Sequence, residues 1–520
     1  MKNWPFHTNR EASIIARHDN VAVAKRDIDR GTVVRLNGFE IRVVDDIPAG
    51  QRFAVTDIEG GELLNQYGWP FGISNGIKGG SLVNPSSMRR HHEDVREMAE
   101  RRMESLRGVS RFVPTVFTDI GRTFEGYARH DNRAGTRNFY LIVPASLCAS
   151  DVASKIAFTA GAVAGGIENL DGVVAAAHTE GCGCNDGEII ERLITVLKNT
   201  IIHPNVGGAL IVDLGCEKIH GNDLMDALGD LKAIGKPVDA LSIQACGGTR
   251  RAVEKGREIV LSMLAEASSV KRRPLPLSLL TAGLECGASD TFSGLTANPL
   301  IGKTVDRVIS GGGSAILSEV PEMLGAEALL LSRMNATETV ERFVKGVEYY
   351  RAIAEGLGVS MDGNFVYGNE KGGLLNPALK SLGAVLKGGE AEIVSFLEYG
   401  ESLKEQGLSL MNGPGNDLES MTGIVAGGAN IILFSTGMGA TEGNLIAPVI
   451  KISSTTGLFQ KMDEDIDFDA GPLLDGEITL DEMSGRLMDL MVDVASGKKT
   501  WAEQWEKRSF QIWTAGKLSL

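Results

Sequence analysis

The stretch "DGVVAAAHTEGCGCNDGEIIERLITVLKNTI" (residues 171–201) contains one complete strand–turn–helix unit, and its pattern indicates the fold of most of the chain. Residues 172–177 are apolar or small without a break, as expected for a strand buried on both faces of a parallel sheet. Residues 188–201 then repeat apolar side chains three and four positions apart, which is the spacing of an amphipathic helix. The turn between them contains His178, Glu180, Cys182 and Cys184 among glycines, a composition that suits a metal, a nucleophile or a tight corner.

The same alternation of apolar strand and amphipathic helix recurs along the chain, which predicts an α/β protein with mainly parallel sheets. A further α/β segment begins near residue 275 with "LPLSLLTAGLEC" and includes the late apolar runs "ANIILFSTG" and "APVIKISS". The other strand–helix pairs are "RNFYLIVPASL" with "SDVASKIAFTAGAVAGG", "GGALIVDLG" with "GNDLMDALGDLKAIG", and "VDALSIQAC" with "TRRAVEKGREIVLSMLAEA".

The N-terminal 90 residues have a different sequence pattern. Short runs of alternating apolar and polar residues with glycine at the corners, such as "RGTVVRLNGFEIRVVDDI", predict a small β-rich domain. A highly charged run over residues 87–110 follows and predicts a solvated helical connector. We therefore expect four parts: a β domain over 1–90, a linker over 91–122, an α/β domain over 123–274 and a C-terminal α/β domain over 275–520.

Composition excludes several classes of function. The chain has 520 residues and a formal charge of −15, so it would be repelled by a phosphate backbone and nucleic acid is not an expected partner. No apolar run is long enough to cross a membrane and the N-terminus lacks a signal-peptide core, so we expect a soluble, cytoplasmic protein. Six cysteines in a chain of this length are too few for a disulfide framework, and we expect free thiols.

The cysteines fall at the carboxyl ends of predicted strands, where open α/β sheets bind ligands. Cys182, Cys216 and Cys286 are each followed by glycine or an acid rather than by more core, so we predict that these three thiols form a metal or catalytic site. Cysteine is also one of the most buried residue types, and the alternative is that each one packs as a small apolar side chain. Cys148, Cys184 and Cys246 are expected to have this structural or supporting role.

A set of motifs resembles one known family. The chain is similar to the altronate/galactarate dehydratases over roughly residues 12–500, which implies a metal-dependent sugar-acid dehydratase with an N-terminal SAF-type (β-clip-like) domain, a linker and a large two-part α/β body. The motifs, in chain order, are "YARHDNRAGTRN", "HTEGCG", "LGCE", "GGTR", "GLECGASDTFSGLTANPLIG", "AILSEVPE", "GNEKGGL", "KSLGAVLKGG", "GPGND" and "VAGGANIILFSTGMG".

The N-terminal domain departs from the family pattern. Gln51 stands where family members usually carry a histidine, Gln66 replaces a lysine, and "SLVNPSSM" replaces a histidine-rich ending. An imidazole pair and an ammonium group are thus missing from the lobe expected to face the active site, which puts the identity of the substrate in doubt. His91 and His92 lie just downstream and are candidate substitutes.

The implied reaction removes a proton alpha to a carboxylate and expels hydroxide from the beta carbon, giving a 2-keto-3-deoxy acid. A divalent cation can stabilise the enediolate. Fe²⁺ is the first choice, from the family and from mixed thiolate and imidazole ligands, with Zn²⁺ and an iron–sulfur cluster as alternatives.

Candidate residues for this chemistry lie in glycine-rich turns and at strand ends. We predict a small anionic substrate and a homo-oligomer, most simply a dimer. The alternatives are a related lyase that expels another group, such as sulfite from a sulfo-hydroxy acid, and a non-catalytic metal-bound binding protein. The predicted general bases are His178, Lys371 and Glu319, and the predicted substrate-binding residues are Arg137, Arg250, Asn369 and Asp290.

Overall fold

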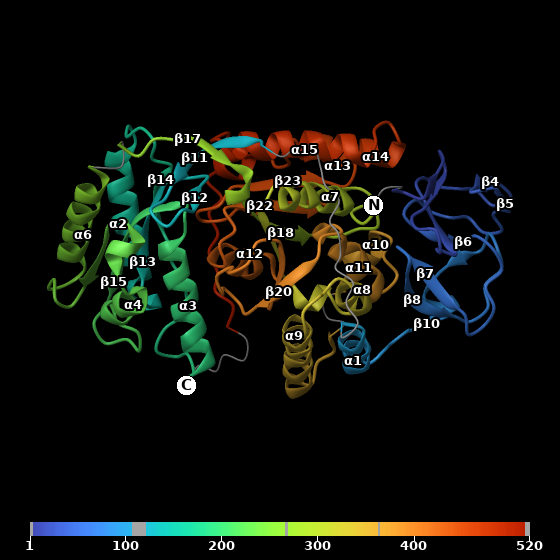
Figure 1. Ribbon diagram of the computed structural model, residues 1–520, viewed down its shortest axis with the longest axis horizontal. Helices are drawn as coiled ribbons and strands as arrows, with labels where there is room; N and C mark the ends of the chain where they lie inside the picture. Colours follow the sequence, from blue (N-terminus) through green and yellow to red (C-terminus); the bar gives the residue numbers. More distant parts are fainter. Residues whose placement is uncertain (1–3, 107–120, 266–268, 362–364, 515–520) are drawn as a thin grey trace.

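The computed structural model describes residues 4–106, 121–265, 269–361 and 365–514. Three bodies follow one another along the long axis of the molecule (Figure 1). The β-rich N-terminal domain lies at one end, a smaller α/β domain lies at the other, and the C-terminal α/β body lies between them. The chain therefore combines a small strand-rich domain with a two-part α/β body, as the sequence predicts.

The N-terminal domain consists of short antiparallel strands that enclose apolar side chains such as Phe53 and Leu64. A five-stranded sheet has the order β1-β2-β3-β6-β9, a three-stranded sheet the order β10-β8-β7, and β4 pairs with β5. The strands are β1 (His7–Thr8), β2 (Ala12–Ile14), β3 (Val21–Ala24), β4 (Val33–Leu36), β5 (Phe39–Arg42), β6 (Arg52–Ala54), β7 (Leu63–Gln66), β8 (Trp69–Ser74), β9 (Leu82–Val83) and β10 (Met88–Arg89).

The second domain is a four-stranded parallel sheet of order β14-β13-β15-β16 with helices packed around it. A small antiparallel sheet, β12-β11-β17, connects it with the C-terminal body. The strands are β11 (Thr123–Ala128), β12 (Ala134–Gly135), β13 (Phe139–Pro144), β14 (Gly172–Ala175), β15 (Val206–Asp213), β16 (Val238–Ser242) and β17 (Arg273–Pro276). The helices are α2 (Leu147–Ala164), α3 (Glu188–Ile202), α4 (Gly221–Leu228), α5 (Leu231–Ile234) and α6 (Thr249–Leu264).

The C-terminal body is built on a seven-stranded parallel sheet of order β20-β21-β19-β18-β22-β23-β24. Its central strands are buried on both faces, which explains their unbroken apolar sequences. The strands are β18 (Thr281–Gly287), β19 (Ser314–Leu317), β20 (Ile393–Leu397), β21 (Leu408–Met411), β22 (Ile431–Thr436), β23 (Val449–Ser453) and β24 (Phe468–Asp469). The helices are α7 (Ala297–Ser310), α8 (Glu327–Ser332), α9 (Thr337–Leu357), α10 (Tyr367–Lys371), α11 (Pro377–Ala384), α12 (Asp417–Ala426), α13 (Thr456–Lys461), α14 (Pro472–Asp475), α15 (Leu480–Ala495) and α16 (Trp501–Gln504).

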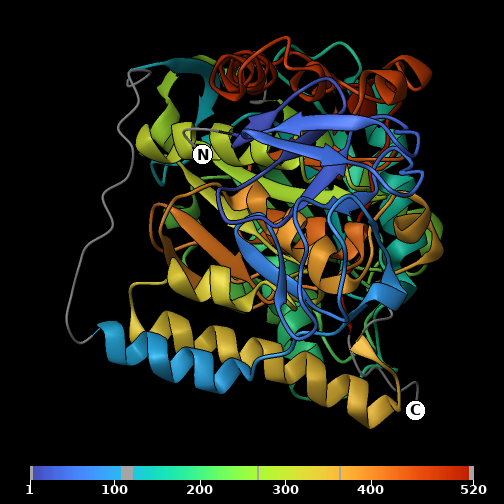
Figure 2. The same cartoon turned by 90° about the vertical axis from the view of Figure 1, so that its right-hand side faces the viewer.

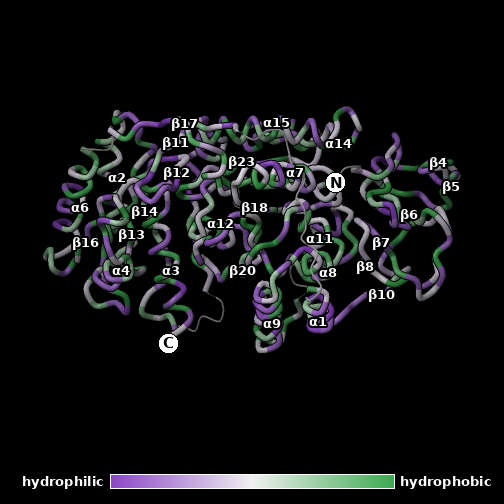
Figure 3. The backbone as a smooth tube through the Cα atoms, in the orientation of Figure 1, coloured by the Kyte–Doolittle hydropathy of each residue, from purple (hydrophilic) through white to green (hydrophobic). Residues whose placement is uncertain are grey.

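The charged connector is helical, but it is not simply a solvated linker. Helix α1 (Val95–Leu106) lies beside α9 (Figure 2), and its Val95, Met98 and Ala99 are buried. The Arg102 guanidinium donates to the Met334 carbonyl at 2.6 Å, which fixes the helix to the C-terminal body. The face away from the body is hydrophilic (Figure 3), and this face accounts for the charge that the sequence shows. Residues 107–120 of the predicted linker lie outside the described residues.

One described helix, α2, is long and apolar enough by composition to cross a membrane. Its Ala153, Ile156 and Ala160 are completely buried against the parallel sheet, as in the core helix of a soluble protein. The apolar character of α2 is therefore explained by packing within the second domain.

Candidate active site

Several ionisable side chains meet at the carboxyl edge of the seven-stranded sheet. Strand β18 contributes Glu285 and Cys286, and the turn after the neighbouring β19 contributes Glu319 and Glu322. The other members are Asp417, the first residue of α12, Lys380 on α11 and Lys387 in the 3-10 turn Val385–Gly388. We call these seven residues the acidic cluster.

The members of the acidic cluster contact one another directly. Lys387 Nζ lies 3.1 Å from Glu319 Oε2, and Lys380 Nζ lies 2.9 Å from Glu322 Oε1. The Cys286 thiol donates to Glu322 Oε2 at 3.1 Å. Six of the seven side chains are buried, so their electrostatic interactions are screened little by water.

Burial and neighbouring charges give these groups different protonation states. Burial and the nearby Glu319 charge raise the pKa of Glu285 well above its usual value, and burial and Glu322 raise the pKa of Glu319. Burial and the charges of Glu319 and Glu322 raise the pKa of Asp417 to about 8. Burial opposes ionisation of Glu322 as well, but Lys380 and Lys387 outweigh it and lower its pKa. Groups whose pKa values are pushed apart in one site are typical of acid–base catalysis.

The backbone at Glu319 is held in an uncommon conformation. Its φ of 72° and ψ of 59° lie in the left-handed region, which costs a non-glycine residue on the order of 1 kcal/mol. The facing turn packs closely here, since a Cβ at residue 413 would lie 1.9 Å from Ser318 Oγ and the Val320 amide donates to the Gly413 carbonyl at 3.0 Å. This turn therefore fixes the Glu319 carboxylate at the end of β19.

The donor atoms of the acidic cluster suit a metal ion. Cys286, Glu319 and Glu322 form one group whose donor atoms lie within 4.8 Å of one another, and Glu285, Glu319 and Asp417 form a second. If all four carboxyl groups ionise, the two paired ammonium groups leave two negative charges unbalanced. Among the residues that the structure describes, no donor reaches Glu285 Oε1 or Glu319 Oε1 when both are ionised, so a shared proton or a cation is needed between them. These features fit a divalent cation.

Of the residues predicted from sequence, Glu319 and Cys286 belong to the acidic cluster, and three others lie near it. The buried Asp290 accepts from Ser293 at 2.7 Å and from the Ser454 hydroxyl at 3.3 Å, and burial raises its pKa. Asn369 is buried and donates to the Ser289 carbonyl, so it supports the turn that contains Asp290. Lys371 is exposed at the end of α10.

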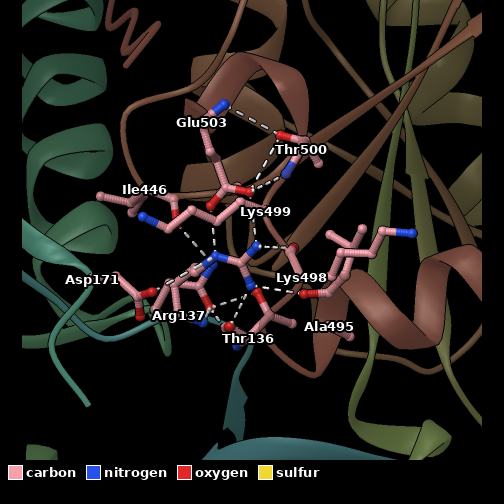
Figure 4. Close-up of polar contacts among 12 residues, drawn as sticks. Thr136, Arg137, Asp171, Ile446, Ala495, Lys498, Lys499, Thr500 and Glu503 are labelled. Atoms are coloured by element: carbon pink, nitrogen blue, oxygen red, sulfur yellow. Dashed lines mark hydrogen bonds and ion pairs between the residues drawn. The ribbon is translucent and has the colours of Figure 1, made fainter. Parts of the chain in front are cut away.

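Arg137 is not available to a substrate, contrary to the prediction. Its side chain is buried, and all five guanidinium N–H groups have partners (Figure 4). It forms a two-point ion pair with Glu503, at 2.6 and 2.8 Å, and donates to the carbonyls of Thr136, Val494 and Lys498. A glycine-rich turn suggested a side chain that reaches into a cleft, but the C-terminal segment covers this turn.

His178 and Arg250 lie at the carboxyl edge of the second domain's sheet. His178 is buried, with its Nε2 2.9 Å from the Pro144 carbonyl and its Nδ1 accepting from the Glu180 amide. Both ring nitrogens thus hold the turn, and these contacts do not favour the predicted role as a base. Arg250 is exposed in the first turn of α6, and its role in substrate binding stays a prediction.

The structure does not bring the three predicted metal-ligating cysteines together. Cys182 and Cys216 are exposed turn residues after β14 and β15, whereas Cys286 is buried in β18 of the other sheet. In the described part of the chain, Cys286 groups with Glu319 and Glu322 and not with the other thiols. The physical reason is that the strands belong to two separate sheets, so their carboxyl ends are not one edge.

Sequence reasoning missed several members of the acidic cluster. Glu285, Glu322 and Asp417 lie inside motifs that carry the family resemblance, but none was singled out as a site residue. Lys380 and Lys387 are seven residues apart in "LKSLGAVLKGG", which places two ammonium groups in an apolar run. Lysine is almost never fully buried unless it is paired, so this run was a usable signal.

The N-terminal domain contacts the C-terminal body next to Asp290. The buried Arg52 donates to Gln66 Oε1 at 2.9 Å within its own domain and to Thr291 Oγ1 at 2.8 Å across the contact. Burial lowers the pKa of Arg52 to about 10. Gln66 thus accepts a hydrogen bond at the position where the family pattern has an ammonium group.

A cavity of about 260 Å³ lies between the end of the N-terminal domain and the C-terminal body. Phe71, His91 and His92 line it on one side, and Arg351 and Lys380 line it on the other. Because Lys380 also pairs with Glu322, the cavity is adjacent to the acidic cluster.

Comparison with known proteins identifies the family. The profile described as "Altronate/galactarate dehydratase SAF domain" matches residues 11–91. The profile of "D-galactarate dehydratase/Altronate hydrolase, second domain" matches 126–268, and that of "D-galactarate/Altronate dehydratase, C-terminal" matches 277–518. The three profiles together match nearly the whole chain, and their order is that of an altronate/galactarate-type dehydratase.

Characterised relatives cover nearly the whole chain. It is 33% identical to altronate dehydratase of Bacillus subtilis (strain 168), over 96% of this chain and 98% of the relative. It is 31% identical to galactarate dehydratase (L-threo-forming) of Escherichia coli (strain K12), over 94% and 93%. It is 30% identical to (2R)-sulfolactate sulfo-lyase subunit beta of Chromohalobacter salexigens, over 75% of this chain and 97% of that subunit. The chain belongs to the altronate/galactarate dehydratase family and is therefore a hydro-lyase.

Proposed function

We propose that the acidic cluster is the active site of a metal-assisted dehydratase, which converts a sugar acid or related 2-hydroxy acid into a 2-keto-3-deoxy acid by β-elimination. The observation that carries this proposal is the pair of facing carboxyl groups, Glu285 and Glu319, buried beside two ammonium groups. Such an arrangement is costly for stability and is typical of a functional site.

The surroundings of each side chain suggest its role. Glu319 is the general base that removes the alpha proton, because its carboxylate is held by a constrained turn and burial raises its pKa toward the working range. Burial and the Glu319 charge raise the pKa of Glu285 well above its usual value, which favours the protonated carboxyl group that can deliver a proton to the departing hydroxyl group. Lys387 remains charged, because Cys286 and Glu319 more than offset the effect of burial on its pKa, and it stabilises the enediolate.

A divalent cation, Fe²⁺ in the first instance and Zn²⁺ as the alternative, would be held by Cys286 and Glu322 with one carboxylate oxygen of Glu319, whose other oxygen remains for proton transfer. When bound, it supplies Lewis-acid stabilisation of the charge that develops on the substrate.

We propose that the preferred substrate is neither altronate nor galactarate. The glutamines of the N-terminal domain replace charged groups, and the adjacent cavity is walled by Phe71 as well as by basic side chains. One charge-assisted hydrogen bond contributes about 1.5–3 kcal/mol, so the loss of two costs orders of magnitude on a polyol with a second carboxylate. We propose a 2-hydroxy acid whose far end is shorter or less polar, handled in the cytoplasm by a homo-oligomer, most simply a dimer.

The test is a substrate panel assayed without oxygen in the presence of Fe²⁺. Galactarate, altronate and shorter or substituted 2-hydroxy acids are compared by kcat/KM, with 2-keto acid and sulfite both measured. We expect 2-keto acid from a shorter or substituted acid and weak activity on the two named sugar acids. A value above roughly 10⁴ M⁻¹s⁻¹ on either sugar acid would show that the N-terminal changes are neutral. Sulfite release without water loss would assign the chain to the other lyase activity.

A further inference from the structure

Every strand of the second domain's sheet is followed by a cysteine at its carboxyl end. In the spatial order β14-β13-β15-β16, these residues are Cys182, Cys148, Cys216 and Cys246. None of them forms a disulfide. Ligands bind at this edge of open parallel sheets, so the position is a functional one.

Three of these thiols are exposed, which is unusual for cysteine. Cys148, Cys182 and Cys216 are exposed, whereas Cys246 is half-buried against the apolar core of the domain. Free cysteine is among the most buried residue types, so three exposed thiols on adjacent strands are not explained by packing. Cys246 is explained by packing.

The turns that contain the three exposed thiols are tied together by buried polar groups. The Leu147 amide donates to the Glu180 carbonyl at 2.6 Å, and the Ser150 hydroxyl donates to the His178 carbonyl at 2.8 Å. These bonds join the Cys148 turn to the Cys182 turn. On the other side, Glu217 accepts from the Ser146 hydroxyl at 3.1 Å and from the Cys216 amide at 2.8 Å. Three turns held in this way form a preorganised set of ligands.

The spacing suits a cluster better than a single ion. Adjacent strands lie about 4.8 Å apart, so the ends of three neighbouring strands span about 10 Å. Thiolates on one tetrahedral ion, with bonds of about 2.3 Å, lie within about 4 Å of one another. In the described residues, the groups with donor atoms within 4.8 Å do not include these thiols. In an iron–sulfur cluster each thiolate binds a different iron, so the thiolates lie farther from one another than they do on a single ion.

We propose that Cys148, Cys182 and Cys216 bind an iron–sulfur cluster of the four-iron type at the edge of the second domain. With three protein thiolates, one iron lacks a protein ligand. Because the three thiols are exposed, that iron would be open to an oxygen ligand, either water or a small hydroxy acid. The cluster site is separate from the acidic cluster, and the proposal does not rest on the proposed function.

The test uses full-length protein purified under nitrogen from iron-supplemented cells. Iron and acid-labile sulfide are measured per chain, together with the visible absorption and the electron paramagnetic resonance spectrum after reduction. Wild type, Cys246→Ser and Glu319→Gln should contain equal amounts of acid-labile sulfide, with at least one iron for each sulfide, because an ion at the acidic cluster adds iron without sulfide. Cys148→Ser, Cys182→Ser and Cys216→Ser should each lower the cluster content by at least about tenfold.

A second measurement tests the proposal in wild-type protein, in case the cysteine variants do not fold. In wild-type protein, the three thiols should resist alkylation before iron is removed and react after its removal, as read by mass spectrometry. Metal without sulfide, zinc alone, equal cluster content in Cys148→Ser and wild type, or thiols that react equally before and after iron removal would each overturn the proposal.

Discussion

Glu319 and Glu322 lie three residues apart in one buried cluster, yet their surroundings shift their pKa values in opposite directions. Burial and Glu322 raise the pKa of Glu319, whereas Lys380 and Lys387 outweigh burial and lower the pKa of Glu322. Replacement of each by glutamine therefore tests the electrostatics of the site, because the two changes remove the same charge from the same short turn.

Glu319→Gln relieves crowding among carboxylates while Lys387 retains other acidic neighbours, so we expect the unfolding free energy to change by about 1 kcal/mol or less. Loss of a general base should lower kcat by about 10²–10⁴-fold. Glu322→Gln leaves the buried Lys380 without the carboxylate 2.9 Å away, and breaking a buried ion pair costs about 3–5 kcal/mol. In a domain of this size, that loss lowers the Tm by about 10 °C.

The assay combines thermal unfolding at pH 7 with 2-keto acid formation on the best substrate of the panel. The expected pattern is an inactive Glu319→Gln enzyme with nearly wild-type Tm, and a Glu322→Gln enzyme that unfolds early. Equal Tm losses in the two variants would refute the assigned charge states. A Glu319→Gln enzyme with kcat within tenfold of wild type would refute its role as the base.

Three further outcomes are expected. Arg137→Met should cost about 3–5 kcal/mol of stability with KM unchanged, because the side chain contacts Glu503, Asp171 and backbone carbonyls; a tenfold rise in KM would show that it contacts substrate. Burial raises the pKa of Asp19 from 3.8 to about 6, so its stability contribution is present below pH 4 and lost as pH rises through 6. Relative to Asp19→Asn, wild type should therefore lose about 3 kcal/mol between pH 4 and 7, measured by urea unfolding, and a flat difference would contradict the shift. Chelation should abolish turnover and leave the Tm within a few degrees, since a core of this size does not depend on one ion; full activity after chelation would exclude a Lewis-acid role.

The architecture could be predicted because strand and helix periods are local properties of the sequence. The run "ANIILFSTG" predicts a strand buried on both faces, and it is β22, next to the central strand β18 of the large sheet. The same reasoning placed Cys286 at a strand end and Glu319 directly after one. Strand ends are the positions at which sequence alone indicates where side chains meet.

The remaining parts of the site depend on contacts between distant segments. The glycine-rich turn at Arg137 does not reveal that Glu503 closes over it, and the charge of Lys387 does not reveal that the side chain is buried beside Glu319. Cys182, Cys216 and Cys286 share a position relative to their strands, but the first two lie in the predicted 123–274 domain and Cys286 in the predicted 275–520 domain, and the sheets of these domains do not share an edge. Such errors arise wherever tertiary packing, rather than local pattern, decides the environment of a side chain.

The ion pair between Arg137 and Glu503 also has a consequence for biosynthesis. Its partners are 366 residues apart, and at about 5–20 residues per second the ribosome needs about 20–70 s to make the intervening chain. During that interval the Arg137 guanidinium has Asp171 of its own domain, 4.0 Å from its Nε, but not yet Glu503. A chain that stops before residue 503 never acquires the Glu503 carboxylate. The second domain therefore reaches its final stability only after translation has passed residue 503.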